Sequence, residues 1–191
     1  MKTHLLRGLL FGVLLCSSSL IVSCSDENLT TSTALKTIEH YLEEKPVYET
    51  TDLQLGKTKL RTNKDMEEIE HYKSLEKKGL ISFEEESVKK KWLSKDSIWT
   101  TDIHISDLAK PYIISQKSSK VTVKTIQYEL DKEQPLQINN KSKRNATITV
   151  MLFKKETPFA VLAADKNPNS TFITRKFKLK YHEQYGWEVA K

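Results

Sequence analysis

Three polar residues that could carry acid–base or metal chemistry recur at every second position near the middle of the chain. Asp102, His104 and Ser106 fall within or just after a segment rich in β-branched residues. In an extended strand, residues spaced in this way share one face. A carboxylate beside an imidazole can transfer protons, and with Asp107 the group could bind a metal ion. No second histidine lies at ligand spacing, so we expect no metal here.

Trp99 comes shortly before these residues and is the aromatic candidate for a binding site. An exposed tryptophan stacks well on a sugar ring, whereas a buried tryptophan is part of the core. The sequence favours the core, since tryptophans are buried on average. The alternative is a pocket formed by Trp99, Asp102 and His104.

A modification site is indicated next to Trp99. The residues Asp96-Ser97-Ile98 resemble the three-residue O-glycosylation motif of exported Bacteroidetes proteins. The resemblance covers three residues and implies a glycan on the Ser97 hydroxyl. Ser97 is therefore a predicted glycosylation site.

Cys24 lies at the end of a leader with the features of a secretory signal peptide, residues 1–23. A basic start over residues 1–7 precedes an apolar run over residues 9–16, and a second apolar patch ends at Cys24. The residues Ile21-Val22-Ser23-Cys24 resemble the bacterial lipobox. This resemblance implies cleavage after Ser23, diacylglycerol on the Cys24 sulfur and acylation of the new amine. Cleavage by ordinary signal peptidase and a retained membrane helix are the alternatives.

Residues 24–33 are predicted to be the lipidated cysteine and a polar tether. Ser25 followed by Asp26 and Glu27 resembles the export signal that sends Bacteroidetes lipoproteins to the cell surface. The expected location is therefore the bacterial cell envelope, lipid-anchored at the outer membrane and exposed at the surface. The expected partner of this segment is the lipid bilayer, through acylated Cys24.

The composition of the remaining body excludes several functional classes. No cysteine follows Cys24, which excludes disulfides and thiol chemistry in the body. The body has only Gly56, Gly79 and Gly186, too few and too scattered for a phosphate loop or a dinucleotide fingerprint. The chain has a net charge of +6, and removing the leader with its two basic residues leaves +4. We therefore expect no cofactor and no metal.

The hydrophobic pattern predicts an α+β fold with two N-terminal helices packed with a mainly antiparallel C-terminal β-sheet. Apolar residues at helical spacing indicate helices over residues 34–44 and 66–78, and alternation from residue 97 onward indicates strands. Within residues 121–130 the apolar alternation changes phase near Lys124, which predicts a β-bulge. Residues 34–191 would form the domain, with subdomains over 34–116 and 117–191. The predicted core is Leu35, Ile38, Leu42, Ile69, Ile126, Ile148, Val150, Leu152, Phe177, Leu179 and Trp187.

Two short segments resemble parts of a winged-helix domain. Residues 72–83 resemble a recognition helix that passes through Gly-Leu-Ile into the wing, and residues 105–112 resemble the segment after the wing. The resemblance implies a winged-helix-like scaffold over residues 34–116. DNA binding is not expected, because the helix carries four glutamates and the leader directs the domain out of the cytoplasm.

These observations predict a membrane-anchored envelope lipoprotein with a non-enzymatic binding or scaffolding role. Its partner would be an envelope protein or a glycan, and no nucleic acid. The alternative is an envelope hydrolase whose cleft is lined by carboxylates such as Asp102 and Asp107. The sequence lacks a nucleophile motif and metal-ligand spacing, and this favours binding.

The lipobox assignment predicts that Cys24 is the attachment point of the membrane anchor. Cys24→Ala removes the sulfur that would carry the lipid, so the protein should leave the membrane fraction and escape the processing that follows lipidation. Cell fractionation with immunoblotting measures both effects, and Cys16→Ala is the matched control. A Cys24→Ala protein that stays in the membrane and is processed like the wild type would contradict the assignment.

Overall fold

The computed structural model describes residues 28–90, 96–139 and 141–190, so the predicted signal peptide and Cys24 lie outside the described residues. The described residues contain two α-helices, α1 (Thr31–Glu44) and α2 (Met66–Lys77). They also contain two short 3-10 helices, η1 (Asp107–Tyr112) and η2 (Ala160–Leu162). None of these helices is long and apolar enough to cross a membrane.

The strands form two antiparallel sheets. The larger sheet has the order β1-β6-β8-β9-β10, with β5 paired to β6 and β7 paired to β8, and the smaller sheet has the order β2-β4-β3. The strands are β1 (Val47–Gln54), β2 (Gly56–Arg61), β3 (Ile81–Lys90), β4 (Ser97–Ile105), β5 (Ile113–Lys117), β6 (Lys120–Leu130), β7 (Gln137–Asn139), β8 (Asn145–Glu156), β9 (Phe172–His182) and β10 (Gly186–Val189).

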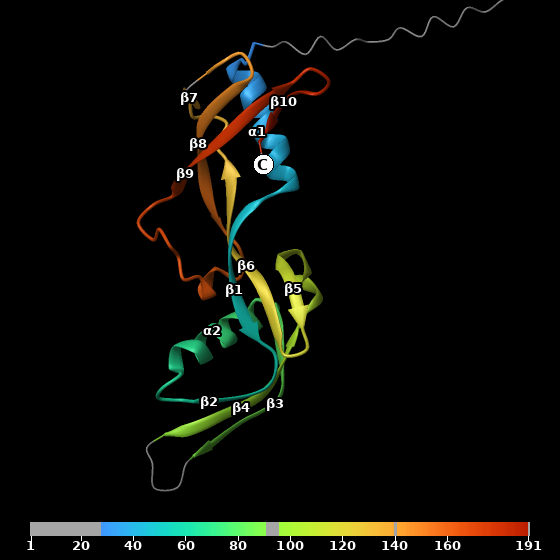
Figure 1. Ribbon diagram of the computed structural model, residues 1–191. Coiled ribbons are helices and arrows are strands. Elements are labelled where there is room, and N and C mark those ends of the chain that lie inside the picture. Colours follow the sequence, from blue (N-terminus) through green and yellow to red (C-terminus); the bar gives the residue numbers. More distant parts are fainter. Residues whose placement is uncertain (1–27, 91–95, 140, 191) are drawn as a thin grey trace, which may run out of the picture.

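The predicted α+β arrangement is wrong. Strands account for 50% of the described residues and helices for 22%. The two α-helices do not pack together on a C-terminal sheet, because β1 and β2 separate them along the chain and each helix belongs to a different core. Figure 1 shows α1 at one end of the molecule and α2 at the other, joined by β1 and β6.

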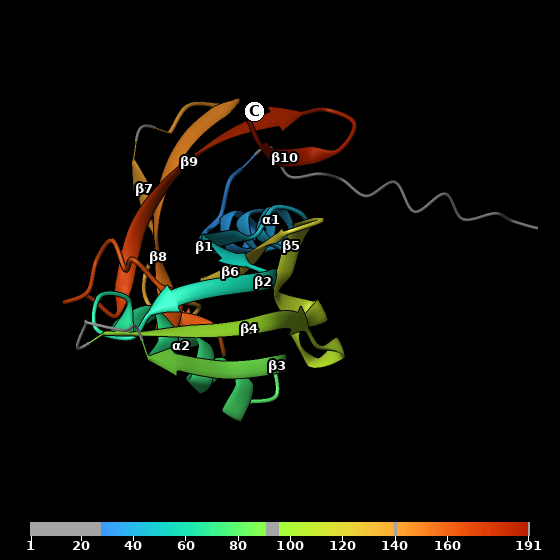
Figure 2. The ribbon, with the colours of Figure 1, turned by 90° about the horizontal axis from the view of Figure 1, so that it is seen from below.

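The first core, called here the α1 core, lies inside the larger sheet, which curls around α1 (Figure 2). Its buried members are Leu29, Ala34, Ile38, Ile126, Tyr128, Ala146, Ile148, Val150, Leu152, Phe177, Leu179 and Trp187. Ala34 and Ile38 are fully buried, and Tyr41 packs edge-on against Phe177 at 5.8 Å. The predicted members Leu35 and Leu42 are only half-buried, because they lie at the sides of the helix stripe.

Helix α1 begins earlier than its apolar pattern indicates. Thr30 is the N-cap, and its Oγ1 accepts a hydrogen bond from the backbone N–H of Thr33 at 3.1 Å. The last residues of the predicted tether, 31–33, therefore form the first turn of α1, and Leu29 before them is buried. The helix ends at Glu44, because Pro46 disfavours the helical conformation at Lys45.

The second core, called here the α2 core, lies between α2, the smaller sheet and one half of β6. Its buried members are Leu53, Leu55, Ile69, Tyr72, Leu75, Leu80, Ile81, Trp99, Ile103, Ala109, Val121, Val123 and Phe159. Helix α2 passes through Gly79, whose positive φ of 71° ends the helix, into the β3–β4 hairpin. This is the order that the winged-helix resemblance implies for residues 72–83; the resemblance itself stays a prediction.

Strand β6 belongs to both cores because of the predicted bulge, which the structure confirms. Glu49 of β1 pairs with Ile126 and Thr50 pairs with Lys124, so Thr125 is the extra residue. The bulge shifts the side-chain alternation by one residue, so Val121, Val123, Ile126 and Tyr128 all lie on the same face of the sheet. Val121 and Val123, on one half of the strand, contact the α2 core, while Ile126 and Tyr128, on the other half, contact the α1 core.

Thr157, just after β8, satisfies the backbone at this bulge. Its hydroxyl lies 2.6 Å from the carbonyl oxygen of Lys124 and 3.1 Å from that of Thr125, and its backbone N–H donates to the Thr125 carbonyl. The same hydroxyl oxygen accepts a hydrogen bond from the N–H of Phe159, whose ring is fully buried in the α2 core. Thr157 thus links the bulge to the α2 core through hydrogen bonds.

Thr157→Val should destabilise the fold, because valine has the same shape but leaves buried backbone groups at the bulge without their partner. We expect a loss of about 1–3 kcal/mol in the free energy of unfolding, measured by urea denaturation. Thr174→Val, at an exposed position of β9, should change it by less than about 0.5 kcal/mol. Equal stabilities of the two variants would contradict this role for Thr157.

Candidate functional site

The structure brings Asp102 and His104 together on the outer face of β4 but places Trp99 on the opposite face. The ring of Trp99 is 1% exposed and packs edge-on against Phe83 at 5.3 Å. Its Nε1 donates a hydrogen bond of 2.6 Å to Glu86. Trp99 is therefore a core residue and shares no pocket with Asp102 and His104.

The Asp102–His104 pair is a surface ion-pair cluster. His104 Nε2 lies 3.3 Å from Asp102 Oδ1 and 3.5 Å from Glu84 Oε2, and its side chain is about half exposed. Asp107 is bound instead to Lys110 at 2.8 Å, which lowers the pKa of its carboxyl. Within the described ranges, no group of three or more His, Cys, Asp or Glu residues is arranged to hold a metal ion.

Ser97, the predicted glycosylation site, is the first residue of β4 and is half-buried. The neighbouring Asp96 has a structural role: its Oδ1 accepts hydrogen bonds from the backbone N–H groups of Asn63 at 3.1 Å and Ser97 at 2.9 Å. These bonds lower the pKa of Asp96 and tie the start of β4 to the segment before α2. Glycosylation of Ser97 stays a prediction.

The stronger candidate for a ligand site is a groove between α1 and β10, which we call the α1–β10 groove. It has a volume of about 440 Å³, and its walls include Lys36, His40, Tyr41 and Lys45 from the helix and Trp187 from the strand. Trp187 is 7% exposed, and its Nε1 is buried without a hydrogen-bond partner. Because a buried donor without a partner is costly, this N–H can gain from an acceptor supplied by a ligand.

The groove carries charges of both signs, from Lys36, Lys45, Glu44 and Glu188. The carboxylate of Glu44 faces His40 Nε2 at 3.6 Å, and that of Glu188 is bound to His182 at 2.9 Å. Lys36 forms no ion pair with any described residue, and Lys45 Nζ lies 5.2 Å from the centre of the Tyr41 ring. The two ammonium groups are therefore the groups of the groove that can bind an anionic ligand.

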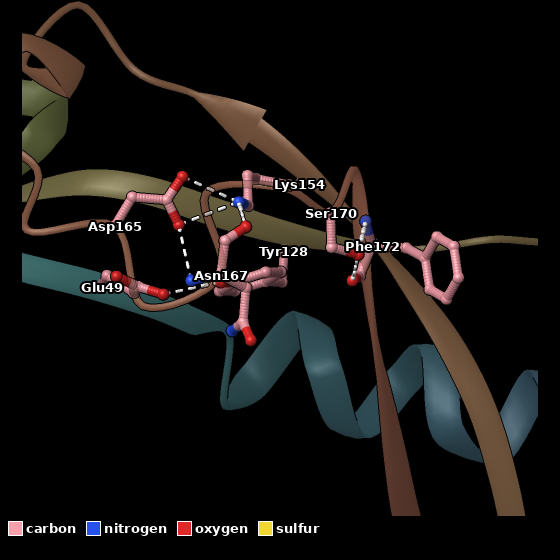
Figure 3. A network of polar contacts seen from close by, with 7 residues as sticks. All are labelled: Glu49, Tyr128, Lys154, Asp165, Asn167, Ser170 and Phe172. Atoms are coloured by element: carbon pink, nitrogen blue, oxygen red, sulfur yellow. Dashed lines mark hydrogen bonds and ion pairs between the residues drawn. The ribbon is translucent and has the colours of Figure 1, made fainter.

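A second polar cluster, shown in Figure 3, lies where the β8–β9 connection crosses β1 and β6. Lys154 Nζ donates to both carboxylate oxygens of Asp165, at 2.9 and 2.8 Å, and to the carbonyl of Asn167. The backbone N–H of Asn167 also donates to Asp165. Beside this pair, the hydroxyl of Tyr128 donates to Glu49 at 2.6 Å.

The protonation states of this cluster suit a structural role. The Lys154 ammonium and the Asn167 N–H hold the pKa of the Asp165 carboxyl below its usual value. Burial and the Glu49 carboxylate raise the pKa of Tyr128 to about 12, so the phenol stays protonated at neutral pH. The charged groups bind one another, and the result is a fixed path for the connection between β8 and β9.

Comparisons with protein-family models, with curated proteins and with solved structures gave no match to this chain.

Sequence reasoning placed Trp187 in the core, and its burial confirms this, but it missed the groove. The groove combines residues 36–45 with residues 187–189, which only the curled sheet brings together. The opposite placement of Trp99 and Asp102 was readable from the sequence, because an odd and an even position of one strand face opposite sides.

Asp165→Asn should destabilise the protein at neutral pH, because the amide leaves the nearly buried Lys154 ammonium without its counter-charge. Since the folded-state pKa of Asp165 is lowered, its contribution is complete above the unfolded pKa of about 3.9 and is lost as the pH falls through the folded pKa. The melting temperatures of wild type and variant should therefore converge in strong acid.

Asp107→Asn is the matched control, because Asp107 also binds a lysine at 2.8 Å, but Lys110 and Asp107 are both exposed. This variant should melt close to the wild type at neutral pH. A constant difference between wild type and Asp165→Asn down to strong acid would show that the loss does not come from the carboxylate charge.

Proposed function

We propose that the protein is a lipid-anchored binding protein of the bacterial envelope and that the α1–β10 groove holds its ligand. The observation that carries this proposal is Trp187, which lines the groove and whose buried Nε1 has no hydrogen-bond partner among the described residues. A buried donor without a partner lowers the stability of the fold, and an acceptor from a ligand would remove this cost.

The ligand that fits the groove best is an acidic saccharide. Carboxylate and hydroxyl oxygens accept hydrogen bonds from the indole N–H of Trp187, and the carboxylate also pairs with the ammonium groups of Lys36 and Lys45. The half-buried ring of Tyr41 supplies an apolar face of the kind on which sugar rings pack. A neutral saccharide would satisfy the indole N–H but would leave both lysines unpaired.

The anchor would keep this groove close to the bilayer. Leu29 is buried in the α1 core and is the fifth residue after Cys24. Five residues span about 17 Å when fully extended. Lipidation of Cys24 would therefore hold the body within a short distance of the membrane.

The alternative function, an envelope hydrolase, has less support. Its carboxylates Asp102 and Asp107 are bound to His104 and Lys110 on an exposed surface. A catalytic acid or base needs a pKa near the working pH, whereas that of Asp107 is lowered. Binding is thus the function that the geometry favours.

The proposal predicts that residues 25–191 bind an acidic oligosaccharide, an oligogalacturonate, more tightly than its neutral galactose counterpart in calorimetric titrations. Trp187→Phe keeps an aromatic ring but removes the N–H, so the affinity should fall roughly ten- to hundredfold, as for a hydrogen bond to a charged group. Lys36→Gln should weaken binding of the acidic ligand only.

Thermal melting provides the control for Trp187→Phe. Because the variant removes a buried donor that has no partner, its melting temperature should equal or exceed that of the wild type. The proposal fails if the two saccharides bind equally, if neither binds, or if Trp187→Phe leaves the affinity unchanged.

A further inference from the structure

The outer face of β9 carries a row of three lysines, Lys176, Lys178 and Lys180, called here the lysine row. They alternate with the buried residues Phe177 and Leu179, so all three point away from the α1 core. All three are exposed. Because the larger sheet curls around α1 (Figure 2), a row that points away from the α1 core lies on the convex side of the sheet.

Among the described residues, a carboxylate lies opposite only one member of the lysine row. The cross-strand partners on β8 are neutral: Thr149, Thr147 and Asn145. Glu188 on β10 is opposite Lys180 and also binds His182 at 2.9 Å. Like charges at alternate positions on one face repel each other, and Lys176 and Lys178 have no carboxylate as a cross-strand partner to offset the repulsion.

The lysine row lies at the end of the body from which the chain leads to the anchor. Lys141 Nζ donates a hydrogen bond of 2.9 Å to the backbone carbonyl of Leu29. Lys141 and Lys178 also line the same hollow, which has a volume of about 530 Å³. Leu29 comes five residues after Cys24, and Figure 1 shows the start of α1 at the same end of the molecule as β7 and β10.

We propose that the lysine row is a membrane-contact surface that binds the anionic headgroups of the bilayer in which the protein is anchored. The proposal rests on lipidation of Cys24 for its geometry, because the short tether holds this end of the body within reach of the headgroups. Lysines near an anionic surface each add to binding, and such a basic surface reinforces a lipid anchor. The row then fixes which face of the body is turned toward the membrane.

The test uses residues 25–191, which contain every described element and lack Cys24, so its outcome does not depend on lipidation. Sedimentation with vesicles of equal parts phosphatidylcholine and phosphatidylglycerol measures the partition coefficient at low salt. The partition coefficient should fall about fivefold for each lysine that is removed. It should therefore fall on the order of a hundredfold in the triple variant Lys176→Gln, Lys178→Gln and Lys180→Gln. The triple arginine variant should bind like the wild type.

The matched control changes Lys59, Lys64 and Lys89 to glutamine, since these exposed lysines lie on or beside the smaller sheet. This control has the same net charge as the triple variant but should change the partition coefficient only slightly. Pure phosphatidylcholine vesicles should bind none of the proteins, and raising the salt concentration should release the wild type.

Three outcomes would overturn the proposal. An equal fall in the partition coefficient of the lysine-row triple variant and of the control triple variant would show that only net charge matters. Equal binding to neutral and anionic vesicles would exclude headgroup charge, and absence of binding to both would show that the row has no affinity for membranes. If the full-length protein is bound to the membrane but any of these results is obtained, lipidation of Cys24 is supported and headgroup binding by the lysine row is rejected.

Discussion

The bulge at Thr125 is the feature on which the rest of the structure depends. Without a bulge, Val121 and Val123 would face the opposite side of β6 from Ile126 and Tyr128. The extra residue reverses the alternation halfway along the strand, so all four side chains lie on one face of the sheet, and one half of β6 contributes to the α2 core while the other half contributes to the α1 core. Thr157 then satisfies the freed carbonyls, which ties the β8–β9 connection to the same point. Both cores and the segment between them therefore depend on one irregularity.

Two buried polar groups, the Lys154 ammonium and the Trp187 indole N–H, have opposite hydrogen-bonding surroundings. The Lys154 ammonium is surrounded by acceptors from Asp165 and Asn167, so it has no capacity left for a ligand. The Trp187 indole N–H is also buried but has no acceptor, and Trp187 lines a groove with two lysines on its helix wall. A native fold satisfies nearly all of its buried polar groups, and among the described residues Trp187 Nε1 and Asp131 Oδ2 are the exceptions. The position of Trp187 beside the groove supports the proposal that a ligand binds there.

The charge distribution differs between the two ends of the molecule. The carboxylates that could suggest catalysis lie beside His104 on the smaller sheet, where Glu84 is exposed and Asp102 is half-buried. At the other end, Lys36 and Lys45 line the α1–β10 groove, and the lysine row lies on the outer face of β9. Catalysis requires convergent groups with tuned pKa values, whereas adhesion and ligand capture require only accessible charge of one sign. This end of the molecule is also the one to which the predicted tether leads.

The sequence by itself determined the local features whose cause is local. The phase change in β6, the span of α2, the final hairpin and the burial of residues such as Ile38, Ile148 and Trp187 follow from periodicity and turn residues. The tertiary structure alone decided what depends on distant segments. The pairing of β1 with β6 brings together residues separated by the whole α2 core, and it places α1 and α2 at opposite ends. The α1–β10 groove and the missing acceptor of Trp187 likewise depend on how the sheet curls, which no local pattern encodes because sheet curvature is set by long-range strand pairing.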